Sequence, residues 1–215
     1  MTVLYEKFLE AVSGHEMTIE NDTGVHRSIV FRNPRDSELW FRIVTWPGHL
    51  AISGDTSSFM FERIEDMFHF FKIQPGQIRT EYWAEKLVAH SVQSGHRAFC
   101  WDKFVLDLTK ECQITASSDT LSKEELDEKV KAQVELLCAT IENDEYGAVD
   151  LIRNWSFQVE AFEELSLLGK LDPYSSGFME YGFKGEFTYH FQWCLHAIVW
   201  AIQQYNLHKG GTSDA

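Results

Sequence analysis

The feature that most constrains the fold is a change of hydrophobic period between His26 and Phe71. Apolar residues first fall in short β-branched and aromatic runs, which is the pattern of strands in a sheet with one buried face. From Ile64 onward they recur at the three-to-four-residue spacing of an amphipathic helix. The Trp-Pro-Gly-His sequence at residues 46–49 has Pro and Gly where a type II turn requires them, so the strands beside it should pair as a hairpin.

The same reading of the chain predicts an α+β fold, in which helices pack on an antiparallel β-meander of four to five strands within residues 15–62. Strands are expected at 17–20, 26–32, around 40–44, 50–53 and 59–61, and helices at 3–12, 63–72 and 81–89. Residues 188–205 are apolar on nearly all sides, which predicts a core helix across the sheet. Ser122 and Glu125 have the spacing of a capping box, which should begin a helix that runs to about Ile141.

These elements predict four parts. They are a sheet with flanking helices over residues 1–95, an acidic helical lobe over 96–170, a C-terminal core-helix region over 171–207, and a disordered tail over 208–215. No window of 18 residues is wholly apolar, and the first apolar stretch contains charges, so neither a membrane span nor a secretory signal is expected. Four cysteines (100, 112, 138 and 194) without a CxxC spacing indicate reduced thiols of a cytoplasmic protein.

Charge is distributed unevenly along the chain. The sequence has 33 acidic residues against 19 Lys and Arg, a formal net charge of −14. The segment from Glu111 to Leu165 holds 14 carboxylates and four cations, and therefore −10 of that charge. An acidic surface repels phosphate backbones, so the segment disfavours direct nucleic-acid binding and favours a protein partner with a basic surface. A solvated helix surface that only aids solubility is the alternative.

Five blocks of sequence carry a resemblance. They are IVFRNP (29–34), WFRIVTWPGHLAISGD (40–55), FMFERIEDMFHFF (59–71), YWAEKLVA (82–89) and FTYHFQWCLHAIVWAIQQYN (187–206). In this order the blocks resemble a family of uncharacterised proteins encoded by temperate phages and prophages. The resemblance covers about residues 5–90 and the last 30, and it brings no activity or catalytic residue. It implies a phage accessory gene product that works in the cytoplasm of the bacterial host cell.

Two groups of side chains resemble metal or nucleophile sites. His190 and Cys194 are four residues apart and share a helix face, whereas His196 points elsewhere on the same helix. Cys100 with His96, or Cys194 with His190, has the residue types of a thiolate and its base. A core helix whose polar groups are satisfied by neighbours explains the first group better, so we expect no metal and no cofactor.

Loops of the meander offer a second candidate site. His49, Asp55 and Glu62 lie in or near turns, where a general acid and base can project, although Asp55 directly after Gly54 is more typical of a turn. Most aromatic residues fit the core, whereas Trp40, Trp46 and Trp83 lie near loops and are the aromatics best placed to line a ligand pocket.

The leading interpretation is a non-enzymatic phage or prophage accessory protein that binds and inhibits a host defence or nucleic-acid-handling protein. Its carboxylates would act as a DNA mimic by occupying a basic groove that otherwise holds phosphates. The residues expected to bind are Glu124, Glu125, Asp127, Glu128, Glu135, Asp144 and Glu145, with Trp46, His49 and Asp55 as secondary candidates. Two alternatives stay open: a small enzyme with a His/Asp site on the meander, and an oligomeric structural or regulatory phage protein.

Overall fold

The computed structural model describes the chain except for residues 1, 161–164, 174–177, 179–182, 184 and 212–215. Contacts within the chain divide it into two compact units, which we treat separately. The first unit contains residues 1–96 and 187–215, and the second contains residues 97–186. The second unit is therefore an insertion in the sequence of the first, and residues 171–186 belong to it rather than to the C-terminal core region.

The first unit is built on a six-stranded antiparallel sheet in which each strand pairs with the next along the chain. Its strands are β1 (Glu16–Thr23), β2 (His26–Asn33), β3 (Asp36–Trp46), β4 (His49–Gly54), β5 (Phe59–Glu62) and β6 (Leu87–His90). Gly48 has a φ of +80° in the turn between β3 and β4, which is a conformation that glycine adopts without strain. The predicted α+β fold with an antiparallel meander is confirmed, with one more strand than expected.

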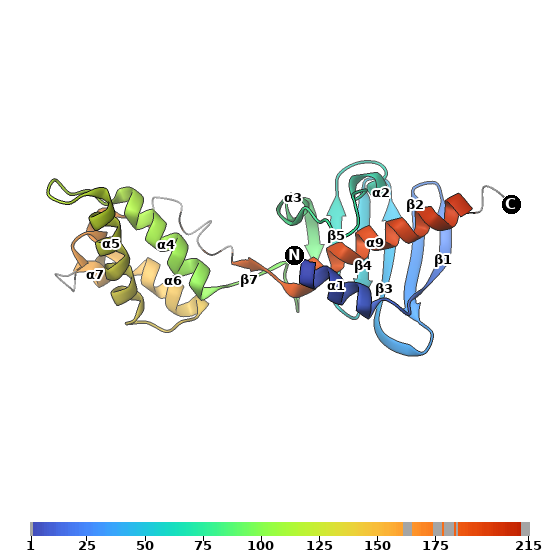
Figure 1. Ribbon diagram of the computed structural model, residues 1–215, viewed down its shortest axis with the longest axis horizontal. Helices are drawn as coiled ribbons and strands as arrows, with labels where there is room; N and C mark the ends of the chain where they lie inside the picture. Colours follow the sequence, from blue (N-terminus) through green and yellow to red (C-terminus); the bar gives the residue numbers. More distant parts are fainter. Residues whose placement is uncertain (1, 161–164, 174–177, 179–182, 184, 212–215) are drawn as a thin grey trace. The chain divides into compact units, whose positions relative to one another are not determined.

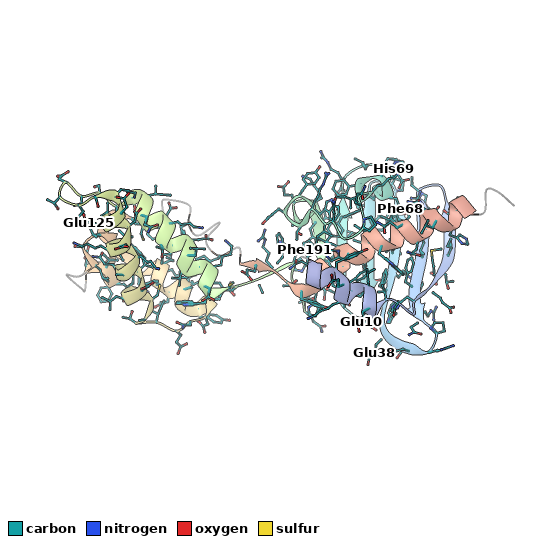
Figure 2. The ribbon with its side chains drawn as sticks, viewed as in Figure 1. Glu10, Glu38, Phe68, His69, Glu125 and Phe191 are labelled. Carbon is teal, nitrogen blue, oxygen red and sulfur yellow. The ribbon has the colours of Figure 1, made fainter. Side chains whose placement is uncertain are left out.

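Two helices cover one face of this sheet. The long C-terminal helix α9 (Tyr189–Gly211) runs across the strands, and α1 (Thr2–Ala11) lies beside it (Figure 1). Alternate strand residues such as Phe31, Phe41 and Ile52 are buried against them, as is Phe191, which Figure 2 labels on α9. Burial of apolar surface on this scale is the main force that holds such a two-layer unit together.

The segment after the meander differs from the prediction. The helix expected at 63–72 is shortened to α2 (Met67–Phe70), because the backbone groups of Arg63 and Glu65 hydrogen-bond to Gly48 instead. The helix expected at 81–89 is divided into α3 (Thr80–Ala84) and the strand β6. This strand forms because β5 has an unpaired edge, which β6 occupies through the pairs of Met60 with Ala89 and Phe61 with Leu87.

The expectation of a disordered tail from residue 208 is wrong for its first four residues. Helix α9 continues through Gly211, and the Lys209 ammonium lies 2.6 Å from an Asp22 carboxylate oxygen on β1. This ion pair fixes the last turn of the helix to the sheet. Residues 212–215 lie outside the described part of the chain.

The second unit is helical. It contains α4 (Trp101–Thr115), α5 (Lys123–Cys138), α6 (Glu145–Arg153), α7 (Trp155–Glu160) and the 3-10 helix η2 (Leu168–Lys170) around its own apolar core. The short strands β7 (Arg97–Ala98) and β8 (Glu186–Phe187) pair where the chain enters and leaves the unit. The predicted capping box is confirmed, since Ser122 and Glu125 each accept a hydrogen bond from the other's backbone N–H at the start of α5.

Candidate functional site

The acidic residues predicted to bind a partner divide into two groups by their surroundings. On α5, Glu124, Glu128 and Glu135 are exposed and lie within about 40° of one another around the helix axis, so they form one row that we call the acidic stripe. The buried residues Val130 and Val134 lie on the other side of the helix. The rise of the helix gives the stripe a length of about 16 Å. Its carboxylates take no part in the packing of α5 on the core of the unit.

The other predicted carboxylates stabilise the unit itself. Glu125 completes the capping box, and its hydrogen bonds from the Ser122 backbone and side chain lower the pKa of its carboxyl group. Asp127 is partly buried and lies 2.7 Å from the Lys123 ammonium. Asp144 caps α6 by accepting a hydrogen bond of 2.7 Å from the Gly147 backbone.

Members of the stripe, in contrast, have few internal partners. Within the described part of the chain, Glu124 and Glu128 make no hydrogen bond or ion pair, and Glu135 has only a long contact of 3.9 Å with Lys131. Glu145, the first residue of α6, is likewise exposed. These four carboxylates are the ones available to a partner.

One exposed apolar side chain lies on the same helix as the stripe. Leu136 is 49% exposed and lies about 80° to 120° around the helix axis from the three stripe carboxylates, at the flank of the helix. Elsewhere in the second unit, Tyr146 on α6 is 86% exposed and Phe157 on α7 is 75% exposed. Exposed aromatic and aliphatic groups among charges are typical of protein interfaces.

The secondary candidates on the meander do not form one site. His49 and Asp55 stand at the two ends of β4, about 20 Å apart from the rise of a strand. The His49 ring stacks on Trp46 with a centroid distance of 5.0 Å and lies 3.6 Å from a Glu62 carboxylate oxygen. The Asp55 backbone N–H instead donates to the Trp40 carbonyl oxygen. A shared acid-base site for these two residues is not supported.

The Cys194 thiol and the His196 imidazole of α9 are buried in the core, whereas His190 is exposed. Burial raises the pKa of the Cys194 thiol well above its usual value, and burial lowers the pKa of His196 to about 4, which leaves both groups neutral near pH 7. A thiol of this kind is a poor nucleophile, because the reactive form is the thiolate. No group of three or more His, Cys, Asp or Glu side chains is close enough to hold a metal ion among the residues that the structure describes.

A partly buried charge network in the first unit has no signal in the sequence pattern. Arg27 makes two hydrogen bonds of 2.9 Å to Asp66, while Asp22 accepts a hydrogen bond from Tyr205 and pairs with Lys209. Partial burial alone would raise the pKa of both carboxyl groups, but the hydrogen bonds from their partners lower it below the usual value. Because both carboxylates are paired and Asp66 also caps α2, the network stabilises the fold rather than acting on a substrate.

Two larger hollows and a smaller one of about 260 Å³ are lined by described residues of the first unit. One of about 870 Å³ lies between α9 and the segment after α2 and is lined largely by apolar residues such as Phe71, Ile73 and Ile202. The other, of about 750 Å³, lies at the β2–β3 hairpin and contains Trp40 and three arginines. Of the three tryptophans near loops, only Trp40 lines a hollow described here, since Trp83 is buried in the core and Trp46 stacks on His49.

Comparison with known proteins gives no relative: the chain matches no protein-family model, no curated protein and no solved structure at a significant level. Among the described residues, no helix combines the length and the apolar character needed to cross a bilayer. Function is therefore inferred from the surfaces of the two units.

Proposed function

We propose that this protein is a non-enzymatic accessory protein whose second unit binds a basic protein through the acidic stripe. Glu124, Glu128 and Glu135 present three carboxylates in one row on α5, with the exposed Leu136 on the flank of the same helix, and this observation carries the proposal. Carboxylates spaced along a rigid helix can occupy a groove that otherwise holds phosphates. The resemblance to phage and prophage proteins supports a host defence or nucleic-acid-handling protein as the target.

Charge favours this role of the second unit. Residues 97–186 hold 19 of the 33 acidic residues and nine of the 19 Lys and Arg, a net charge of −10, whereas the rest of the chain carries −4. A field of this sign accelerates encounter with a basic surface and is screened by salt. Leu136 supplies the apolar contact that slows dissociation once the charges have brought the partner into place.

The binding carboxylates must be separated from those that hold the fold. Replacing Glu125, Asp127 or Asp144 would remove a cap or an ion pair, so a loss of binding in such variants would not distinguish recognition from unfolding. The test variant therefore combines Glu124→Gln, Glu128→Gln and Glu135→Gln. The control combines Glu6→Gln, Glu10→Gln and Glu38→Gln, which removes the same charge from exposed positions of the first unit (Glu10 and Glu38 are labelled in Figure 2).

The experiment is a quantitative affinity capture from bacterial lysate with the wild type and both triple variants, at low and at high salt. We expect basic proteins to be retained by the wild type and by the control, to be lost from the stripe variant, and to be released by salt. Equal capture by all three proteins, or equal loss from both variants, would contradict recognition by the stripe. Thermal melting of each variant checks that the fold is retained.

The alternatives from the sequence receive less support. An enzyme site made of His49 and Asp55 requires groups that meet on one substrate, and β4 holds these two far apart. An oligomer through exposed aromatics would use side chains such as Tyr146 on α6 and Phe157 on α7, which lie on different helices of the second unit.

A further inference from the structure

The sheet face opposite α9 carries a hollow of about 750 Å³ at the β2–β3 hairpin. Phe31 of β2 pairs with Phe41 of β3, but the next pair is Asn33 with Asp36, so β3 has several more residues than β2 in this interval. The surplus residues belong to β3 and widen the end of the hairpin at the foot of these strands in Figure 1, where Figure 2 labels Glu38. Insertions of this kind bend a strand and redirect its side chains.

Contacts to backbone carbonyl oxygens hold this part of β3 in place. Leu39 has a φ of +56°, an uncommon conformation for a residue other than glycine, and its carbonyl oxygen lies 2.9 Å from Nε2 of His15. The next carbonyl, of Trp40, accepts a hydrogen bond of 3.1 Å from the Asp55 backbone N–H. A Cβ on Gly54 would lie 2.2 Å from that same oxygen, so only glycine allows this approach. Trp40 is thus presented on a fixed backbone.

Three guanidinium groups line the hollow beside Trp40. Arg42 is paired with Glu20 at 3.0 Å. Arg32 and Arg35 are exposed, and neither guanidinium group makes an ion pair or a hydrogen bond with any residue that the structure describes, while the Arg35 backbone N–H donates to Oδ1 of Asn33. Two guanidinium groups without a carboxylate partner among the described residues, together with an indole ring, therefore line one hollow, and this combination provides a surface for an anion from outside the chain.

The residue types define the chemistry of that anion. A guanidinium binds phosphate through two parallel hydrogen bonds, and an indole ring stacks on a flat, conjugated ring. Val30, only 2% exposed, provides an apolar neighbour on the same strand face. The volume lies in the range of sites for small ligands, about 300–1,000 Å³. We propose that the hairpin hollow binds a free nucleoside phosphate, with its base on Trp40 and its phosphate on Arg32 and Arg35.

A free nucleotide fits better than a nucleic-acid strand. Asp36 lines the hollow and Glu20 lies beside Arg42, so carboxylates interrupt the path that a longer phosphate backbone would take across the sheet. The rest of the first unit is also net acidic, which disfavours a long polyanion more than a single phosphate group. This inference is independent of the proposed partner binding, because it concerns the other unit.

The test is calorimetric titration of the full chain with adenosine monophosphate, guanosine monophosphate, adenosine, inorganic phosphate and a short single-stranded oligonucleotide. We expect one nucleotide per chain, with weaker binding of adenosine or phosphate alone, and no tighter binding of the oligonucleotide. Absence of saturable nucleotide binding below about 1 mM would overturn the proposal. A far tighter oligonucleotide would overturn it in favour of a strand-binding surface.

Matched variants locate the site. Arg32→Gln with Arg35→Gln should weaken nucleotide binding by about ten-fold or more, because each loses charge-assisted hydrogen bonds to the phosphate. The control pair Arg63→Gln with Arg79→Gln removes the same charge from exposed positions on the same unit and should bind as the wild type does. Trp40→Ala should weaken binding, and Trp40→Phe should restore most of it. Equal effects of the two arginine pairs would place the nucleotide elsewhere.

Discussion

Trp193 on α9 contacts both layers of the first unit. Its indole meets Phe8 of α1 at a centroid distance of 5.2 Å and Phe41 of β3 at 5.7 Å, in edge-on geometry, and it is 1% exposed. Trp200, one of its neighbours on the same helix, is only partly buried. Each indole removed from the centre of a core leaves a cavity that the surroundings fill only in part.

Trp193→Ala is therefore expected to cost on the order of 3 to 5 kcal/mol of unfolding free energy. Trp46→Ala, at a partly exposed position of the sheet, should cost distinctly less. Chemical denaturation followed by circular dichroism measures both. If Trp193→Ala unfolds at the same denaturant concentration as the wild type, α9 does not organise the core.

His196 gives the first unit a specific response to pH. Its ring is 1% exposed and lies against Tyr5, with neither nitrogen hydrogen-bonded within the described part of the chain, and burial lowers its pKa to about 4. In the unfolded chain this imidazole has a pKa near 6.5, so below that pH the imidazole is protonated in the unfolded state while it stays neutral in the folded state. The contribution of neutral His196 to the free energy of unfolding is complete above about pH 6.5 and is lost as the pH falls towards 4.

The expected loss over that interval is about 3 kcal/mol, from a pKa difference between about 6.5 and about 4. His196→Leu should flatten the dependence between these pH values, whereas the acid-induced loss below pH 4 should persist, because Asp22 and Asp66 have lowered pKa values. Urea denaturation at several pH values gives the two curves. Parallel curves would show that His196 is not buried as a neutral ring.

At the level of helices and strands, the parts that were predictable are those in which local pattern and burial agree. Alternating apolar residues predicted β2 to β5, the Pro-Gly turn predicted the β3–β4 hairpin, and the Ser122 spacing predicted the start of α5. The sequence pattern predicts a helix over residues 81–89, since Leu87 and Val88 fit a helical as well as a strand period. Residues 87–90 form a strand because they pair with the free edge of β5, which exists only in the assembled sheet.

The candidate sites were predictable to a smaller extent. The acidic residues of α5 stand out in the sequence, but which of them cap, pair or remain exposed depends on helix phase and on neighbours such as Lys123 and Ser122. The hairpin hollow is indicated in part by the local sequence, since Arg32, Trp40 and Arg42 flank a Pro-Arg turn on one strand face. Its recognition requires the unequal pairing of β2 with β3, which the sequence pattern does not give.

The capping box is expected to stabilise the second unit by a definite amount. Ser122→Ala removes a side-chain acceptor from the Glu125 backbone N–H at the start of α5, which should cost about 1 kcal/mol. Ser156→Ala, at an exposed position of α7, serves as the control and should be close to neutral. Helical circular dichroism during thermal melting reports both, and equal melting of the two variants would contradict a role of the cap.

The whole molecule combines two units that each have their own apolar core and their own kind of surface. The first unit presents arginines and Trp40 on its sheet, and the second presents most of the negative charge on helices. Because residues 97–186 are inserted between β6 and α9, the first unit needs both ends of the chain to form its core. The proposed recognition by the acidic stripe would therefore belong to a unit that takes no part in the core of the first unit.

The decisive measurement is the association rate of a captured partner with the wild type, the Glu124/Glu128/Glu135 triple glutamine variant and the Glu6/Glu10/Glu38 control over a range of ionic strength. We expect the wild type and the control to associate rapidly at low salt and to slow steeply as salt is added, because electrostatic steering depends on complementary charge. The stripe variant should associate slowly, with a shallow dependence on salt. The same rate and the same salt dependence in all three proteins would contradict recognition through the acidic stripe.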